Sequence, residues 1–210
     1  MTGIAAAFGA AASFMGTHGC SWRHGSFRRP AARLGMLLAP MRAAPNIILV
    51  GPMGSGKTAV GRSLARFLGK AFYDSDTEIV RRTGVDIPYI FEKEGEAGFR
   101  EREREAIEAL VALRGIVLAT GGGAILLPEN RRLLAERGCV VYLETSVEQQ
   151  TERVQHGRSR PLLSNVDPAI RLQELMAVRD PLYRSIADIT VSTDGRRVKS
   201  VAEDIVRMIR

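Results

Sequence analysis

A glycine-rich motif between a predicted strand and a predicted helix restricts the fold of this chain more than any other feature. Residues 51–58 read GPMGSGKT and match the pattern G-x-x-x-x-G-K-[ST] in full. The preceding residues, NIILV at 46–50, are typical of a buried strand. Apolar residues at helical spacing follow the motif, namely Val60, Leu64, Ala65 and Leu68. This order of strand, loop and helix predicts a site for the phosphates of a nucleotide.

Each residue type in the motif has a physical purpose. Glycine lets backbone amides approach phosphate oxygens without a Cβ in the way, and the positive end of the following helix points at the same place. Lys57 is expected to reach the β- and γ-phosphates, and the Thr58 hydroxyl is expected to ligate Mg²⁺. The alternative is a glycine turn without a ligand, which this strand and helix context disfavours. The predicted nucleotide-binding residues here are Gly54, Ser55, Gly56, Lys57, Thr58 and Ala59.

Short β-rich runs recur along the chain, and helical stretches separate them. The runs are 46–50, 71–74, 116–119, 139–143 and 189–191. This alternation predicts an α/β fold in three layers, with a parallel sheet and helices on both faces. Ligands of such a sheet bind at the carboxyl ends of its strands. One helix is expected to begin at Asp167-Pro168 and to end near Arg179, because Asp180-Pro181 repeats the start signal.

Two of the predicted strands end in residues that suit phosphate chemistry. Asp74-Ser75-Asp76 follows the second run, and its two carboxylates are candidates for holding hydrated Mg²⁺ and for accepting a hydroxyl proton. The alternative is that they only cap a helix, where Ser75 and Glu78 resemble a capping box. Three glycines at 121–123 follow the third run. They permit the close approach of a ligand, and a tight turn is the alternative.

Two arginine-rich segments supply further candidate ligands for anions. Most charges of the segment 92–112 are expected to form a solvated helix face with i,i+4 pairs, and periodicity alone does not separate Arg100 and Glu103 from them. The segment 148–167 carries three arginines in a polar stretch. It fits either a mobile flap over a phosphate site or a solvent-exposed loop.

The length and charge of the chain argue against several classes of protein. A length of 210 residues suits one domain, and no apolar run reaches the length of a membrane span. The net charge is +7, but residues 1–45 hold five arginines and no acidic residue, which leaves +2 for the remainder. That balance argues against a nucleic-acid partner and suits an anionic small substrate. Cys20 and Cys139 fit a reducing compartment.

Residues 1–45 are rich in alanine, glycine and arginine. Three interpretations stay open: a transit peptide, a disordered basic arm, and an upstream start, because Met41 immediately precedes a natural start for the first strand. We expect a flexible, non-catalytic extension before a single domain at 46–210.

Six motifs in order give the chain a resemblance to a known family. They are GPMGSGKT at 51–58, DSD at 74–76, GEAGFRERE at 95–103, ATGGGA at 119–124, RPLL at 160–163 and RDPLY at 179–183. Together they resemble shikimate kinase of the common bacterial and plant type, over residues 46–210. The resemblance implies ATP-dependent phosphorylation of the shikimate 3-hydroxyl, with Mg²⁺, on the route to chorismate and the aromatic amino acids. It also implies a P-loop kinase fold with five parallel strands, a substrate-binding helical region and a mobile lid at about 153–166.

The resemblance also implies roles for residues on the substrate side of the site. Asp76 would take the 3-hydroxyl and act as the base, Arg100 and Arg179 would clamp the substrate carboxylate, and the backbone of Gly122 would contact a ring hydroxyl. Arginine forks match a planar carboxylate well, which supports the clamp on physical grounds. The base and both clamp arginines are present, so we expect an active enzyme.

On the nucleotide side, the resemblance makes Arg160 the lid arginine at the phosphates. Arg153 would lie near the adenine, Arg196 is a looser match for a second residue there, and Asp74 would hold Mg²⁺ through water. Phosphoryl transfer is chiefly positioning and charge stabilisation, so Mg²⁺, Lys57 and Arg160 suffice around the γ-phosphate.

Two rival functions stay open at this point. A related small-molecule kinase, such as a gluconate kinase, would share the fold and would also act on a carboxylate. A non-catalytic nucleotide-binding module would bind ATP but not shikimate. We expect a cytoplasmic monomer that binds neither nucleic acid nor membrane, with plastid import as the alternative if residues 1–45 are a transit peptide.

Overall fold

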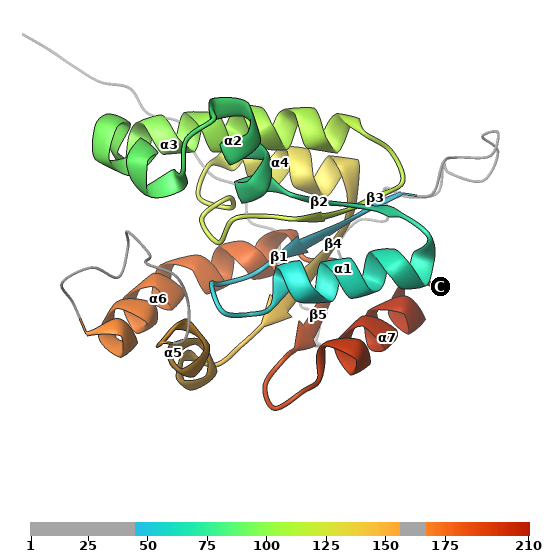
Figure 1. Ribbon diagram of the computed structural model, residues 1–210. Helices are drawn as coiled ribbons and strands as arrows, with labels where there is room; N and C mark the ends of the chain where they lie inside the picture. Colours follow the sequence, from blue (N-terminus) through green and yellow to red (C-terminus); the bar gives the residue numbers. More distant parts are fainter. Residues whose placement is uncertain (1–44, 156–166) are drawn as a thin grey trace, which may run out of the picture. The chain divides into compact units, whose positions relative to one another are not determined.

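The computed structural model describes residues 45–155 and 167–210, in which strands and helices alternate (Figure 1). The strands are β1 Asn46–Val50, β2 Ala71–Asp74, β3 Ile116–Ala119, β4 Gly138–Glu144 and β5 Ile189–Ser192. The helices are α1 Lys57–Leu68, α2 Ser75–Thr83, α3 Ile87–Ala112, α4 Pro128–Arg137, α5 Val147–Gln155, α6 Pro168–Ile186 and α7 Val198–Ile209. No helix of these described ranges is both long and apolar enough to cross a bilayer. The predicted extension lies outside them up to residue 44, and the predicted lid lies outside them from residue 156 to residue 166.

The strands form one parallel sheet in the order β2-β3-β1-β4-β5. The central strand is β1, in which Leu49 lies opposite Ala119 of β3 and Val50 lies opposite Tyr142 of β4. The α/β class, the five parallel strands and the helices on both faces are confirmed. The helices lie between the strands in sequence because parallel neighbours need a crossover connection.

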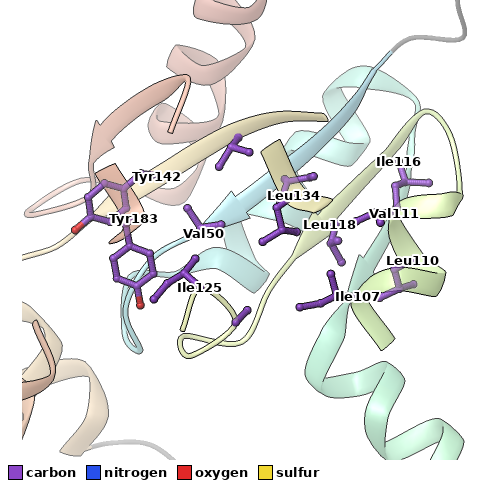
Figure 2. Close-up of a cluster of buried hydrophobic side chains, with 13 residues drawn as sticks. Val50, Ile107, Leu110, Val111, Ile116, Leu118, Ile125, Leu134, Tyr142 and Tyr183 are labelled. Carbon is purple, nitrogen blue, oxygen red and sulfur yellow. The ribbon is translucent and has the colours of Figure 1, made fainter. Parts of the chain in front are cut away.

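Helices cover both faces of the sheet, so its central strands are apolar on both sides. Along β1, Ile47 and Leu49 pack into one core cluster with side chains of α1 and α7. Ile48 and Val50 pack into the opposite cluster, which receives side chains from α3, α4 and α6 (Figure 2). This alternation follows from the two-residue period of a strand. It holds β1 at the centre of the sheet, with the glycine loop directly after its carboxyl end.

Helix α3 consists of two helical segments that meet at Gly95, whose φ of 70° and ψ of −173° are not helical. Glycine adopts this backbone conformation at little cost. Beyond the kink, the buried positions recur at helical spacing at Phe99, Arg100, Glu103, Ala106, Ile107 and Leu110. Arg100 and Glu103 are therefore buried, unlike the solvated charges around them. The sequence pattern alone did not distinguish them.

Helix α6 is continuous from Pro168 to Ile186 and contains Pro181, so the predicted end near Arg179 is wrong. A proline inside a helix removes one backbone hydrogen bond. Here Leu182 and Tyr183 pack against the core cluster that also contains α3 side chains, and this burial offsets the loss. As a result, Arg179 and Tyr183 lie about one turn apart on the same helix face.

Candidate active site

Three segments meet at one edge of the sheet, because the carboxyl ends of parallel strands point the same way. They are the glycine loop after β1 (the first loop, 51–56), the start of α2 directly after β2, and the loop after β3 (the third loop, 120–127). The first and third loops touch: a Cβ added at Gly122 would lie 3.4 Å from the backbone nitrogen of Met53. The start of α2 and the third loop are joined by Ser75, whose Oγ accepts a 2.8 Å hydrogen bond from the backbone N–H of Gly121. Three motifs that are distant in the sequence therefore form one candidate site.

Glycine shapes the first loop, as Gly51 and Gly56 show most clearly. Gly51 has a φ of 146°, and a Cβ there would lie 2.6 Å from the carbonyl oxygen of Leu143. Gly56 has a φ of 86° and is the N-cap of α1, where it provides no side-chain cap. The first backbone N–H groups of a helix have no partner within the helix, and with the helix dipole they form a site for an anion. The predicted phosphate-binding residues 54–59 lie in this loop and in the first turn of α1.

Lys57 directs its ammonium group into the first loop. Nζ donates hydrogen bonds to the carbonyl oxygens of Gly51 at 2.8 Å and Pro52 at 2.6 Å, and to Ser55 Oγ at 3.3 Å. The side chain is buried. Phosphate oxygens of a nucleotide would take over some of these contacts, because the ammonium is a compact point charge with three donors.

Thr58 and Asp74 bring two oxygen atoms together at the start of α1 and the end of β2. Thr58 Oγ1 donates a 2.8 Å hydrogen bond to Asp74 Oδ2. The other carboxylate oxygen accepts hydrogen bonds from the backbone N–H groups of Asp76 and Thr77, and so caps α2. The capping box expected for Ser75 is wrong, because Asp74 is the cap and Ser75 binds Gly121 instead.

Four charged side chains gather beside the third loop: Asp76, Arg100, Glu103 and Arg179. Arg100 donates a 2.6 Å hydrogen bond from one terminal nitrogen to Glu103 Oε2 and a 2.9 Å bond from the other to Glu96 Oε1. Arg100, Glu103 and Arg179 are 8%, 0% and 4% exposed. Charges are rarely buried to this extent unless they are paired, so this group is either a structural network or a binding site.

The charges of these four side chains favour the binding of an additional anion beside them. Burial lowers the pKa of Arg179 and the charge of Arg100 adds to this, while interactions with Tyr183, Glu96 and Glu103 oppose the lowering without reversing it. Burial also acts to lower the pKa of Arg100, but Glu103 and Glu96 together raise it above its ordinary value. Burial raises the pKa of Glu103, and the charge of Asp76 adds to this effect while Arg100 opposes it. Arg179 is therefore the guanidinium whose charge a bound carboxylate would compensate most.

The third loop needs glycine because charged side chains pack directly against its backbone. A Cβ at Gly121 would lie 2.6 Å from Glu103 Oε1 and 2.7 Å from Asp76 Oδ1. A Cβ at Gly123 would overlap the guanidinium of Arg100. The two carboxylates and the guanidinium therefore line the backbone on either side of Gly122.

The two predicted adenine-side arginines are both close to the loop after β5, which Arg153 contacts from α5 and in which Arg196 lies. Arg153 of α5 donates hydrogen bonds to the carbonyl oxygens of Gly54 at 2.9 Å and Thr193 at 3.0 Å. Arg196 donates to Ser200 Oγ at 3.0 Å and pairs with Asp204 of α7. Arg153 thus contacts the glycine loop, whereas Arg196 is directed to α7. The predicted lid arginine, Arg160, lies outside the described residues.

Sequence reasoning missed three side chains of this site: Ser75, Glu103 and Tyr183. Ser75 and Glu103 lie within motifs that also predict a helix cap and a solvated helix face, so the pattern gave no reason to single them out. Tyr183 follows Arg179 at i+4, which is a usable signal on a helix. The predicted end of the helix near Arg179 concealed that spacing.

Comparisons with known proteins agree with the fold and the motifs. The family model for shikimate kinase matches residues 53–210. The shikimate kinase of Thioalkalivibrio sulfidiphilus is 55% identical over 170 residues, which are 81% of this chain and 90% of the relative. A structure of shikimate kinase from Acinetobacter baumannii in complex with shikimate has a TM-score of 0.78 at 50% identity, with 80% of this chain and 94% of that chain covered. A gluconokinase from Sinorhizobium meliloti, with 80% and 93% covered, has a TM-score of 0.54 at 20% identity, which shows a shared fold alone.

Proposed function

Because the chain belongs to the shikimate kinase family, we propose that it transfers the γ-phosphoryl group of ATP to the 3-hydroxyl of shikimate. The products would be shikimate 3-phosphate and ADP, on the route to chorismate and the aromatic amino acids. The observation that carries the proposal is the buried pair of guanidinium groups, Arg100 and Arg179, at the same edge of the sheet as the glycine loop. They provide positive charge for a carboxylate near a site for phosphates.

The nucleotide would bind through the first loop and the start of α1. Backbone N–H groups of residues 54–59 would surround the phosphates, and Lys57 would exchange its carbonyl contacts for phosphate oxygens. Arg153 already contacts the carbonyl of Gly54, which supports a place for it beside the nucleotide. We keep Arg196 as a candidate for the adenine side, although its guanidinium would first have to leave Asp204.

Mg²⁺ fits the pair formed by Thr58 and Asp74, because a hydroxyl and a carboxylate oxygen from two elements lie within 2.8 Å of each other. Among the described residues, no group of three or more acidic, His or Cys side chains could hold a metal ion. Mg²⁺ in kinases takes one or two carboxylates together with substrate phosphates and several waters. Thr58 would bind the ion directly, and Asp74 would bind it through water. The ion would neutralise charge on the phosphates.

Asp76 would act on the 3-hydroxyl while the two arginines hold the carboxylate at the other end of the substrate. The hydroxyl oxygen forms a bond to the γ-phosphorus, the bond from that phosphorus to the β-phosphate oxygen breaks, and the proton passes to the Asp76 carboxylate. The backbone of Gly122 would contact a ring hydroxyl. The Asp76 carboxylate lies against Gly121, so it is next to the loop that this substrate pose requires.

The proposal also includes Arg160 and the lid. Residues 156–166 lie outside the described residues, so their roles rest on the resemblance in sequence. Arg160 would stabilise the negative charge of the transferring phosphoryl group. Closure of a lid at about 153–166 would exclude water and limit the hydrolysis of ATP.

The test is an assay of ADP release with ATP, Mg²⁺ and either shikimate or gluconate, run on the wild type and on Asp76→Ala. We expect turnover with shikimate, little with gluconate, and loss of most turnover in the variant with modest change in ATP affinity. Turnover with gluconate alone would establish the related-kinase alternative. ATP binding without turnover of either acid, unchanged in Asp76→Ala, would establish the non-catalytic module.

We further propose a cytoplasmic monomer without nucleic-acid or membrane partners. The near balance of charge beyond residue 45 supports the absence of a nucleic-acid partner. Removal of residues 1–40 should leave the kinetics unchanged, since the candidate site is formed by loops that begin at residue 51. Altered kinetics after the deletion would assign the extension a role in catalysis. The oligomeric state of the full chain is tested separately by sedimentation velocity, in which we expect the mass of a monomer.

A further inference from the structure

One tyrosine on α6 lies next to two of the groups to which the proposed function assigns contacts with shikimate, namely the Gly122 backbone and Arg179. The hydroxyl of Tyr183 donates a hydrogen bond to the carbonyl oxygen of Gly122 in the third loop. Tyr183 also follows Arg179 by one helical turn, and both side chains are buried. The charge of Arg179 also acts on this phenol, where it opposes the rise in pKa that burial causes. A single phenol oxygen therefore lies between the loop and the guanidinium.

The ring of Tyr183 is held rigidly. It stacks on Tyr142 of β4, with ring centroids 5.0 Å apart and an interplanar angle of 22° (Figure 2). Tyr142 in turn donates a 2.7 Å hydrogen bond to Asp180, which accepts a second bond from Arg184. The packing of both rings would be satisfied by phenylalanine, because the aromatic area supplies the apolar burial. A buried hydroxyl without a hydrogen bond costs free energy of folding. We therefore look for a role of the Tyr183 hydroxyl other than packing.

The geometry points to Tyr183 as a positioning residue, whose hydroxyl fixes the Gly122 peptide and the Arg179 guanidinium at a constant spacing for the substrate. This inference rests on the proposed function, in which Gly122 and Arg179 contact the ring hydroxyl and the carboxylate of shikimate. A trans peptide directs its C=O and the next N–H to opposite sides. Holding the carbonyl of Gly122 therefore also fixes the direction of the Gly123 N–H.

The hydroxyl can serve both partners at once. A phenol has one proton to donate and lone pairs that can accept, so while it donates to Gly122 its lone pairs stay available to the Arg179 guanidinium one helical turn away. Burial raises the pKa of Tyr183, against the opposing charge of Arg179, so the proton stays in place throughout the neutral range. In this inference, the Gly122 peptide is held by the hydrogen bond and Arg179 is held by its place on the same helix face.

The experiment compares Tyr183→Phe with Tyr142→Phe in the full chain. Both changes remove one hydroxyl from the same stacked pair of rings, but only the first removes a contact with the proposed substrate site. In Tyr183→Phe we expect the KM for shikimate to rise about tenfold, from the loss of one hydrogen bond and the misplacement of a second group, while the KM for ATP stays within about twofold. Tyr142→Phe should keep both KM values near those of the wild type.

Folding is checked first by thermal unfolding of both variants. Loss of one buried hydrogen bond in a domain of this size should lower Tm by about 2–12 °C. If Tyr183→Phe does not unfold cooperatively, replacement of Tyr183 by 4-aminophenylalanine keeps a donor to Gly122 at the same place. That variant should regain most of the affinity for shikimate.

A double-mutant cycle with Arg179→Lys separates positioning from a general structural effect. The two residues act as a unit in this inference, so the effect of Arg179→Lys on the KM for shikimate should shrink severalfold in the Tyr183→Phe background. Equal rises of both KM values, an unchanged KM for shikimate in Tyr183→Phe, or additive effects in the cycle would each overturn the inference. Absence of shikimate turnover in the wild type would instead overturn the proposed function on which it rests.

Discussion

The replacement of Gly121 by alanine tests how closely the third loop positions the proposed base. The new Cβ would lie 2.6 Å from Glu103 Oε1 and 2.7 Å from Asp76 Oδ1. Ordinary van der Waals contact begins at 3.4 Å, so each carboxylate has to move by roughly three-quarters of an ångström. Glu103 is fully buried and paired with Arg100, so most of the movement falls on the half-buried Asp76.

A displacement of this size should appear chiefly in kcat. Misplacement of a reacting group by about 1 Å can cost about 100-fold in rate, which corresponds to about 2.7 kcal/mol in the activation barrier. We therefore expect kcat for shikimate phosphorylation to fall about 30- to 100-fold in Gly121→Ala. The KM for ATP should change by less than about threefold, because the first loop is not displaced.

Gly138→Ala is the matched control. Its Cβ would lie 2.6 Å from the carbonyl oxygen of Asn46, an overlap at the same distance but with backbone. It falls at the start of β4, where Gly138 pairs with Asn46 at the opposite end of the sheet from the site. Overpacking there should cost about 1–3 kcal/mol of stability, and lower Tm by about 2–12 °C, with little change in kcat at a temperature where the variant is folded. A kcat for Gly121→Ala within about threefold of the wild type, or an equal loss of kcat in both variants, would refute the reasoning.

Three further predictions follow from named contacts. In Arg100→Ala, the KM for shikimate should rise at least about tenfold with the KM for ATP unchanged, and an unchanged KM for shikimate would remove Arg100 from the clamp. Thr58→Val should raise the concentration of Mg²⁺ needed for half-maximal rate, whereas Thr58→Ser, which keeps the hydroxyl, should need about the same concentration as the wild type. The same Mg²⁺ requirement in Thr58→Val and the wild type would contradict the assignment of Thr58 as a ligand. The hydrogen bond from Arg81 lowers the pKa of Glu78 to about 2, so the carboxylate stabilises the fold at neutral pH and this contribution is lost as pH falls from about 4.3 towards about 2. Urea unfolding of the wild type and Glu78→Gln should show their difference in stability vanish over that range, and a difference independent of pH would contradict it.

The sequence predicts the sheet well because its strands are local patterns. The central runs, β1 and β3, are short and apolar throughout because they are buried on both faces. The outer strands β2 and β5 are only partly buried, and their turn residues and their place between helical stretches mark them instead. The glycine loop is predicted for a similar reason, since all the residues of the motif that shape it are adjacent in the chain. Lys57, Thr58 and the loop glycines therefore lie where the motif indicates.

The substrate side of the site is less predictable because it depends on tertiary packing. Glu103 belongs to a run of alternating charges, and only the packing of α3 after the kink at Gly95 decides which of them are buried. Asp74 and Ser75 both suit a helix cap, and the contact between Ser75 and the third loop decides between them. Neither the packing of Glu103 nor the bond between Ser75 and Gly121 can be predicted from the neighbouring residues in the sequence.

Helix α6 shows how a local rule can conceal a functional contact. Asp180-Pro181 is a sound start signal, and it predicts that Arg179 ends one helix. Burial of Leu182 and Tyr183 in the core outweighs the hydrogen bond that proline removes. Only the continuous helix brings the Tyr183 hydroxyl to Gly122 and to Arg179.

The measurement that tests the account most directly is a crystal structure of the wild type with ADP, Mg²⁺ and shikimate bound. We expect the shikimate carboxylate within hydrogen-bonding distance, about 2.7–3.2 Å, of both Arg100 and Arg179, and the 3-hydroxyl within the same distance of Asp76. Shikimate bound with its carboxylate away from both guanidinium groups, or with its 3-hydroxyl beyond reach of Asp76, would contradict the proposed function.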